Sequence, residues 1–350
     1  MTPDFAGELL PALRKTFGPR WNIDTDGDRF HIHHQDAGSP YRPPRRPPDW
    51  PELLERLEAG FARQGVPRVP PLPLRWGRDT DFTISAVQAL DPYLKHAKPY
   101  TYGQGYLPQP VIRFTGKRDQ QGQLFDGFAT SFVNVSRVQP IHDVTEHAEI
   151  IDGWLSILSS LGIHARHIDI TGRTSTWTRG PVSGITLHIS HATIPIGDTV
   201  LLWNTANPDH LATDLGSGLE RLRWTITRQP WTDLLHGPFA HHHDPATLDA
   251  LRTATLALAN GIHPASHGPG NAIRRLLRTV PSGVADLGLS RVVRHWHSYW
   301  SLTGGAQHTW ATVTTALEDE LASVLRETAP RPRSAAHEPI AHSAAKSIKQ

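Results

Sequence analysis

The spacing of apolar residues along the chain predicts a short helix and a hairpin at the N-terminus. Apolar residues recur at helical spacing from Leu9 to Phe17 and stop at Gly18, which predicts a first helix. Two alternating segments then flank Asp26-Gly27, a dipeptide typical of a hairpin turn. We therefore expect residues 1–36 to form a small appended unit.

The same pattern predicts helices and strands through the middle of the chain. Residues 37–50 are rich in proline and predict an extended linker. One helix is predicted to begin after the cap residue Asp49 and to reach about Gln64, and another to run over 147–161. Strands are predicted at 80–88, 110–117, 127–136, 166–171, 184–190 and 199–205. Because most of them are separated by loops, antiparallel pairing is favoured over β-α-β crossovers.

After about residue 217 the pattern becomes helical. Asp244-Pro245 is typical of a helix start, with a cap residue followed by a first-turn proline. Further helices are predicted near 270–279, 284–300 and 307–328. The last residues, 330–350, have no apolar periodicity and are expected to be disordered.

These elements predict an α+β fold in which an antiparallel sheet is flanked by helices and followed by an α-helical domain. The expected units are 1–36 (appended unit), 37–50 (linker), 51–235 (sheet domain), 236–329 (helical domain) and 330–350 (tail).

Composition narrows the functional classes. The 350 residues are 38% hydrophobic and 19% charged, which excludes wholesale disorder. The absence of cysteine excludes disulfide scaffolds, thiolate zinc sites and cysteine nucleophiles. There is no apolar run of about 18 residues and no signal-peptide pattern, so we expect a cytoplasmic protein without a membrane partner. A net charge of +2 permits nucleic-acid binding without arguing for it.

The stretch DLGSGLERL, residues 214–222, is the strongest chemical pattern in the chain. A strand leads into two glycines, and a helix with an arginine in its first turn follows. Glycines let a flat ligand approach the backbone, and Arg221 can stack on a base or hold a phosphate. Taken alone, the pattern also fits a tight turn with a surface Arg–Glu pair.

The wider context gives this stretch a resemblance. It is similar to the third signature motif of class II aminoacyl-tRNA synthetases, in the D-x-G-x-G-L-E-R form of the alanyl-tRNA synthetase family. Further segments resemble that family in the same order: IRFTGK (112–117), FATSFVNVS (128–136), LWN (202–204) and GIHPASHGPGNAIRR (261–275). The resemblance covers about 52–300. It implies a class II catalytic core and an acceptor-stem helical domain, without the editing and C-terminal domains of the family.

The resemblance implies that ATP and Mg²⁺ serve to form an aminoacyl adenylate, which is then transferred to tRNA. Adenylation passes through a transition state dense in negative charge, so catalysis depends on positioning and on cationic groups. Arg113 would hold the α-phosphate, and Arg221 would contact the triphosphate or stack near the adenine. Gly216 and Gly218 would let the nucleotide lie against the sheet.

The resemblance also implies a site for a small, alanine-like amino acid. Asp214 would pair with its ammonium group, with Asn204 nearby. Trp177 would close the side-chain pocket, although an ordinary core tryptophan is an equal alternative. Arg274 and Arg275 would face the acceptor stem of the tRNA.

Several positions depart from the family. Phe125-Asp126 and Thr130 stand where the family has histidines and a glutamate, and residues 180–187 lack the cysteines and glutamate of its pocket motif. Three alternatives therefore stay open. The chain is a catalytically degenerate paralogue that binds tRNA, an aminoacyl ligase with a carrier protein or small molecule as acceptor, or an enzyme for another cationic substrate held by Asp214.

Histidines are abundant, with 22 in the chain. They cluster at 31–34, 164–167, 241–243 and 295–297. No cluster shows two histidines four apart on a helix with a third ligand nearby. We therefore predict no metal site.

Overall fold

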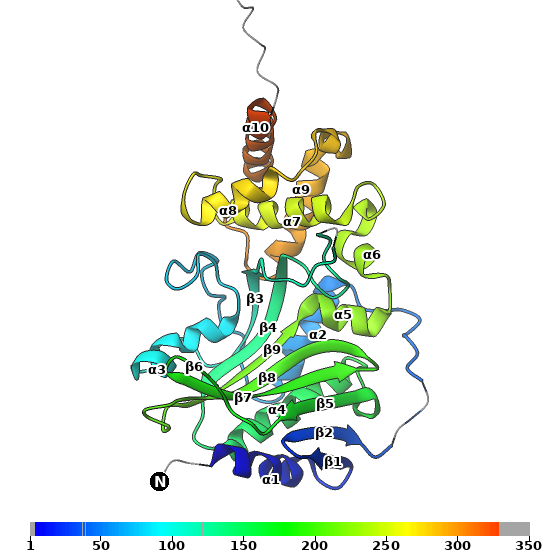
Figure 1. The fold of residues 1–350 in the computed structure, drawn as a ribbon. Coiled ribbons are helices and arrows are strands. Elements are labelled where there is room, and N and C mark those ends of the chain that lie inside the picture. The colour runs from blue at the N-terminus through cyan, green and yellow to red at the C-terminus, as the bar shows by residue number, and fades with distance from the viewer. Residues whose placement is uncertain (1–3, 37, 39, 121, 329–350) are drawn as a thin grey trace, which may run out of the picture.

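A nine-stranded antiparallel sheet organises the described part of the chain, and the C-terminal helices stack beyond one end of it (Figure 1). The computed structural model describes residues 4–36, 38, 40–120 and 122–328, so the predicted tail 330–350 lies outside the described residues. The sheet and its helices confirm the predicted α+β class. No helix in the described part of the chain has the length and apolarity needed to cross a membrane.

The strands follow the order β1-β2-β5-β7-β8-β9-β4-β3, and β6 pairs with β7 outside this path. Their bounds are β1 (Trp21–Asp26), β2 (Arg29–His34), β3 (Tyr106–Ile112), β4 (Ser131–Pro140), β5 (Ile168–Arg173), β6 (Trp177–Arg179), β7 (Val182–His191), β8 (Ile194–Asn204) and β9 (Leu211–Gly218).

Helices fill the chain before, between and after the strands. The α-helices are α1 (Phe5–Phe17), α2 (Trp50–Ala62), α3 (Asp91–His96), α4 (Val144–Ser160), α5 (Leu219–Thr227), α6 (Trp231–His236), α7 (Pro245–Ala259), α8 (Gly268–Leu277), α9 (Leu289–Ser301) and α10 (Trp310–Thr328). Short 3-10 helices are η1 (Ala86–Leu90), η2 (Ala165–His167), η3 (Gly237–Phe239) and η4 (Ser282–Leu287).

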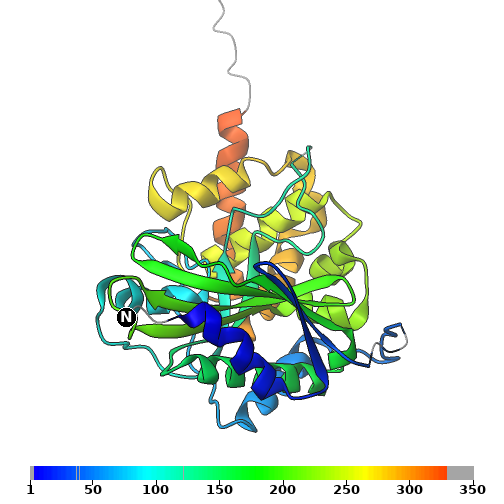
Figure 2. The ribbon, with the colours of Figure 1, turned by 60° about the horizontal axis from the view of Figure 1, so that its bottom comes forward.

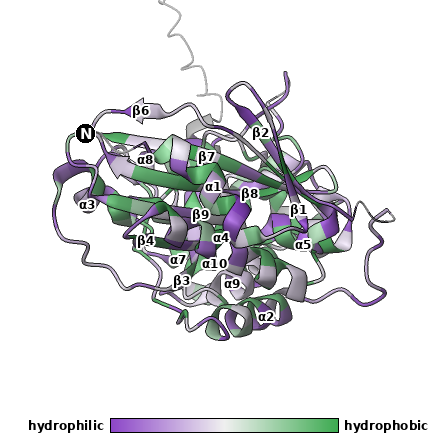
Figure 3. Cartoon of the chain, turned by 90° about the horizontal axis from the view of Figure 1, so that it is seen from below, coloured by the Kyte–Doolittle hydropathy of each residue, from purple (hydrophilic) through white to green (hydrophobic). Residues whose placement is uncertain are grey.

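The two faces of the sheet differ in polarity because neighbouring residues of a strand point to opposite sides. On one face the buried side chains are Ile32, Ile170, Leu187, Leu201 and Leu215. They share one hydrophobic core with apolar residues of α1, α2, α4 and α5. Hydrophobic residues accordingly gather in the central strands and helices, with hydrophilic stretches at the periphery (Figure 3).

The opposite face carries a polar row of residues that are direct partners on adjacent strands. The polar row consists of Asp24, His31, Thr171, His188, Asp198, Gly216 and Ser136, in that order from β1 to β4. Residues of this row line a cavity on that face of the sheet.

The N-terminal unit is joined to the rest of the chain through the sheet. Its hairpin extends the sheet by pairing β2 with β5, and α1 packs against α4 (Figure 2). Residues 1–36 thus contribute the edge of the main sheet. The division of the chain into domains stays a prediction.

One predicted strand, 80–88, is wrong. Ser85 accepts a hydrogen bond from Val87, and the side chain of Gln88 accepts one from the backbone N–H of Ser85, so a capping box starts the 3-10 helix η1. The only ladder contact in this segment is a single bridge between Arg75 and Phe82. Local side-chain capping therefore overrides the alternating pattern.

Helix starts follow their predicted caps more closely. Asp49 accepts a hydrogen bond from Glu52 at the start of α2, and Asp244 accepts one from Thr247 at the start of α7. The helix predicted over 147–161 begins earlier, because Asp143 caps it.

A buried ion pair joins the sheet to the C-terminal helices. Arg252 on α7 donates to Glu220 on α5 over 2.6 Å, and both side chains are almost completely buried. Glu220 also accepts from the backbone N–H of Val133 on β4 and from the Tyr299 hydroxyl on α9. The Arg252 guanidinium lies 4.5 Å from the ring centroid of Trp300. Four elements therefore meet at one pair of charges.

Removal of one partner should be strongly destabilising, because it leaves the other charge buried without compensation. We expect Glu220→Gln to lower the free energy of unfolding by about 3–5 kcal/mol in urea denaturation. Arg56→Ala, which breaks the exposed Arg56–Glu52 pair of α2, is the control and should cost less than about 0.5 kcal/mol. Equal losses in the two variants would contradict this role.

Candidate functional site

A cavity of about 470 Å³ opens on the polar face of the sheet. Its floor is formed by β4, β8 and β9, and its walls by the segment after β3 and the start of α5. Among its lining residues are five that the sequence singles out: Arg113, Asp214, Gly216, Gly218 and Arg221. The fold therefore brings together residues that are about one hundred positions apart in the chain.

The two arginines are oriented by carbonyl groups and aromatic rings. Arg113 donates from Nε and Nη2 to the Ile84 carbonyl oxygen, over 3.1 and 2.5 Å, and its guanidinium lies 5.3 Å from the Phe132 ring centroid. Arg221 donates from Nε to the Gly127 carbonyl oxygen over 2.8 Å. A guanidinium has five N–H donors, so each arginine keeps donors for an anion in the cavity.

The carboxylate of Asp214 is buried in a way that disfavours its charged form. Its Oδ1 atom is buried and has no hydrogen-bond partner among the described residues. Burial and, to a smaller extent, the nearby Asp198 raise its pKa, Arg113 lowers it, and the net result is a pKa of about 7. Burial also raises the pKa of Asp198, while His188 and Arg113 lower it. An ammonium group is the ligand that would relieve this arrangement.

Gly216 keeps the floor of the cavity open. A Cβ atom at this position would lie 3.2 Å from Asn134 Nδ2 and 3.8 Å from Asp198 Oδ1. Any longer side chain would therefore enter the space between β4 and β8. Gly218 ends the strand directly before α5, the helix that carries Arg221.

The segment between β3 and β4 forms one wall. The two strands pair antiparallel, as the resemblance implies for residues 112–117 and 128–136, although β3 ends at Ile112. Thr130 is buried, and its backbone N–H donates to Asp249. Arg118 donates to the Gly122 carbonyl oxygen over 2.8 Å, within the segment itself. Phe125 is exposed.

Two residues predicted to bind the amino acid lie outside this cavity. Asn204 donates to the Leu94 carbonyl oxygen over 2.6 Å and accepts from the backbone N–H groups of Ala206 and Asn207. Its side-chain amide therefore stabilises the turn that follows β8. Trp177 donates from Nε1 to Thr186 Oγ1 over 3.0 Å and lines a neighbouring groove.

That groove is continuous with the cavity. It has a volume of about 1,050 Å³ and shares Thr171, His188 and Asp198 with the cavity. From there it extends over β5 and β2 toward the N-terminal hairpin. The polar row therefore runs beneath both spaces.

The arginines predicted to bind tRNA lie on α8, among the stacked helices (Figure 1). The Nε atom of Arg274 is 3.5 Å from Oε1 of Glu320 on α10. Arg275 is exposed. They are separate from the cavity.

Three lining residues were missed at the level of sequence: Asn134, His188 and Asp198. Each lies in a strand that also carries other polar residues, so its polarity alone does not mark it. Once Gly216 is placed on the ligand-facing side, pairing of adjacent strands assigns Asp198 to the same side. The pairing partners, however, are not visible in the sequence.

The acidic residues of the cavity fit Mg²⁺ together with a phosphate ligand. Mg²⁺ is usually held by one or two carboxylates and by substrate phosphates. Asp198 and Asp214 both line the cavity and are close enough to raise the pKa of Asp214. Asp198 is the residue that would hold the ion, because an ammonium group suits the unpartnered carboxylate of Asp214.

Comparison with known proteins gives little beyond the chain itself. No protein-family model matches the sequence, and no curated protein matches it. Among solved structures, it is similar to that of Desulfitobacterium hafniense PylSc, a pyrrolysyl tRNA synthetase, with a TM-score of 0.32 and 15% sequence identity. The match covers 53% of this chain and 74% of that one. A likeness of this degree carries no conclusion about activity, so the case for a function rests on the cavity's own residues.

The raised pKa of Asp214 predicts that this carboxylate destabilises the fold above neutral pH. Its contribution to stability is fully present below its ordinary pKa of 3.8 and is lost as the pH rises through about 7. We expect Asp214→Asn to increase the free energy of unfolding at pH 8 by on the order of 4 kcal/mol, and by less than half of that at pH 5.

Urea denaturation at the two pH values measures this difference. The exposed Asp126→Asn is the control for the substitution itself. A wild-type protein more stable than Asp214→Asn at pH 8 would contradict the unfavourable burial of Asp214.

Proposed function

We propose that the cavity binds ATP and a small amino acid and joins them as an aminoacyl adenylate. The observation that carries this proposal is the convergence of Arg113, Arg221 and Asp214 over a floor kept open by Gly216. Two cations suit a polyphosphate, and a buried carboxylate without a partner suits an ammonium group. The order of the motifs resembling class II synthetases supports the same function.

In this reaction a carboxylate oxygen of the amino acid attacks the α-phosphorus of ATP. The bond from that phosphorus to the bridging oxygen breaks, and pyrophosphate leaves with the electron pair. Arg113 and Arg221 stabilise the negative charge of the transition state from positions fixed before the substrate binds. Asp214, in its ionised form, holds the ammonium group and so orients the carboxylate. Mg²⁺ supplies further positive charge when it is bound with the phosphates.

We expect the amino acid to be small, as the resemblance to the alanyl-tRNA synthetase family implies. The neighbouring groove, with Trp177 in its lining, offers room for a longer side chain or for the acceptor. Because residues 180–187 lack the family's pocket cysteines and glutamate, amino acids other than alanine are candidates as well.

The acceptor that we propose is tRNA, with Arg274 and Arg275 of α8 as its contacts. A carrier protein or a small molecule is the alternative acceptor. A second candidate function is tRNA binding without catalysis. Thr130 favours this second function, because it stands where the family has a glutamate. Thr130 is buried, and its backbone N–H donates to Asp249.

Amino-acid-dependent ATP–pyrophosphate exchange tests the adenylation step directly. We expect exchange with at least one small amino acid, and a loss of about 100-fold or more in kcat/KM for Arg113→Ala and Arg221→Ala. Arg63→Ala, at the exposed end of α2, is the matched control and should retain full activity. The KM for the amino acid should rise as the pH falls below about 7, because Asp214 then takes up a proton.

No exchange across a panel of all small amino acids, from folded protein, would reject the proposed activity. Salt-dependent tRNA binding by that same sample would then select the second candidate. Exchange without transfer to tRNA would point to another acceptor.

The contact with tRNA makes a separate prediction. We expect Arg275→Ala to weaken tRNA binding and to reduce by about one the slope of log K against log salt concentration. Arg274→Ala should also weaken binding. The exposed Arg63→Ala again serves as the control, in filter binding at several salt concentrations. Unchanged affinity in both α8 variants would rule out this docking surface.

A further inference from the structure

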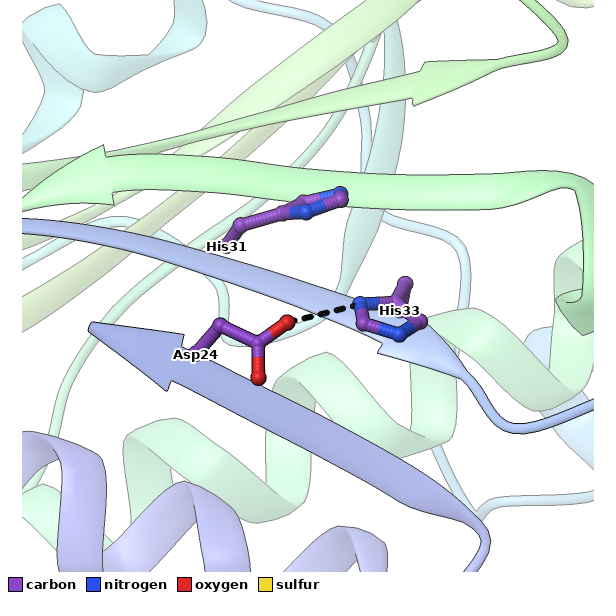
Figure 4. Close-up of side chains that lie close together, drawn as sticks. All are labelled: Asp24, His31 and His33. Atoms are coloured by element: carbon purple, nitrogen blue, oxygen red, sulfur yellow. Dashed lines mark ion pairs between the residues drawn. The ribbon is translucent and has the colours of Figure 1, made fainter. Parts of the chain in front are cut away.

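The N-terminal hairpin carries three metal-binding side chains on one face. His31 and His33 are two residues apart on β2, so both imidazoles project from the same side of the strand. Asp24 on β1 is the direct cross-strand partner of His31. Figure 4 shows the three side chains together at the edge of the sheet.

The potential ligand atoms of this cluster lie close enough together to bind one metal ion. One ligand atom from each residue lies within 4.8 Å of the others, and His33 Nδ1 is 3.6 Å from Asp24 Oδ2. A tetrahedral zinc ion with bonds of about 2.0–2.1 Å holds its ligand atoms about 3.3 Å apart. All three side chains are partly exposed, so small rotations can bring the remaining pairs to that separation.

His33 has a nitrogen that the protein does not satisfy. Its Nδ1 atom is buried and has no hydrogen-bond partner among the described residues, since the carboxylate of Asp24 stands beyond hydrogen-bond length. A buried polar atom without a partner costs stability. A cation between Nδ1 and the carboxylate would satisfy both groups.

Asp169 on β5 supports the cluster from the other side. Its Oδ1 atom is 2.7 Å from His31 Nε2. A carboxylate bound to one imidazole nitrogen fixes the ring and makes the other nitrogen a better ligand, which is a common arrangement behind metal-binding histidines. Asp169 is therefore a positioning residue for His31.

Two of the three side chains line a groove on the surface. Asp24 and His31 line the groove that continues into the cavity, and both belong to the polar row. Three protein ligands leave one position of a tetrahedral ion open, and two of the three ligands line the groove.

From these observations we propose that Asp24, His31 and His33 form a binding site for Zn²⁺ at the edge of the sheet. Two imidazoles and one carboxylate suit a first-row transition metal better than Mg²⁺ or Ca²⁺, which prefer oxygen ligands alone. The site does not depend on the proposed adenylation. It differs from the prediction of no metal site made from the sequence, which rested on the spacing of histidines along helices.

Titration of the full chain with Zn²⁺, after treatment with EDTA, tests the site. We expect one ion per chain by isothermal titration calorimetry. We also expect Co²⁺ bound at the same site to give visible absorption bands of tetrahedral intensity. His31→Ala and His33→Ala should each weaken Zn²⁺ binding by about 100-fold or more, and Asp169→Asn by about 10-fold.

Two further variants keep the test decisive. Asp24→Asn preserves the shape of an exposed side chain, so a loss of Zn²⁺ affinity in that variant cannot come from misfolding. His34→Ala removes the next histidine of β2, which lies on the other side of the strand, and should bind Zn²⁺ like the wild type. Equal affinity in wild type and in His31→Ala/His33→Ala, or no stoichiometric binding by the wild type, would overturn the site. Pyrophosphate exchange, measured on the same samples, reports on the adenylation proposal alone.

Discussion

The buried pair of Glu220 and Arg252 is the interaction on which the arrangement of the cavity depends. Glu220 directly precedes Arg221, and it binds β4, α7 and α9 at once. The pair therefore fixes the start of α5 against the sheet, and with it the guanidinium that faces the cavity. Ion pairs of this kind contribute little net stability compared with apolar packing, but they tolerate no change in one partner alone. The C-terminal helices are thus held to the sheet through charge as well as through the hydrophobic core.

The cavity itself is built from groups that are poorly satisfied without a ligand. Asp214 and Asp198 are neighbouring carboxylates in a partly buried place, and burial disfavours the charge on both. Arg113 and Arg221 lose hydration for the same reason, so burial lowers their pKa values as well. Burying such charged groups lowers the stability of the fold, and apolar packing between the sheet and its helices offsets this loss. This cost is characteristic of a site that is organised in advance for a charged ligand.

Local sequence signals predicted the helices well, because caps such as Asp49 and Asp244 act within one turn. The resemblance to a known family singled out five residues that line the cavity, Arg113 and four within 214–222, because it rests on short continuous segments of sequence. Local signals failed at 80–88, where Ser85 and Gln88 form a local cap. The amide of Asn204 donates to the Leu94 carbonyl oxygen, a partner that the sequence does not indicate. The place of Asp198 depends on which strands are neighbours, and strand order is a non-local property of the chain. The hairpin cluster depends on the register of β1 against β2, which places Asp24 opposite His31.

The length of the polar row limits which ligands can contact both of its ends. Gly216 and His31 are four strands apart along it, and adjacent strands are about 4.8 Å apart, so the two positions are separated by about 19 Å. An aminoacyl adenylate lying at one position does not reach the other. Only an extended molecule, such as a chain-like acceptor, can contact both, and insertion or loss of a strand between them would change the length of ligand that fits.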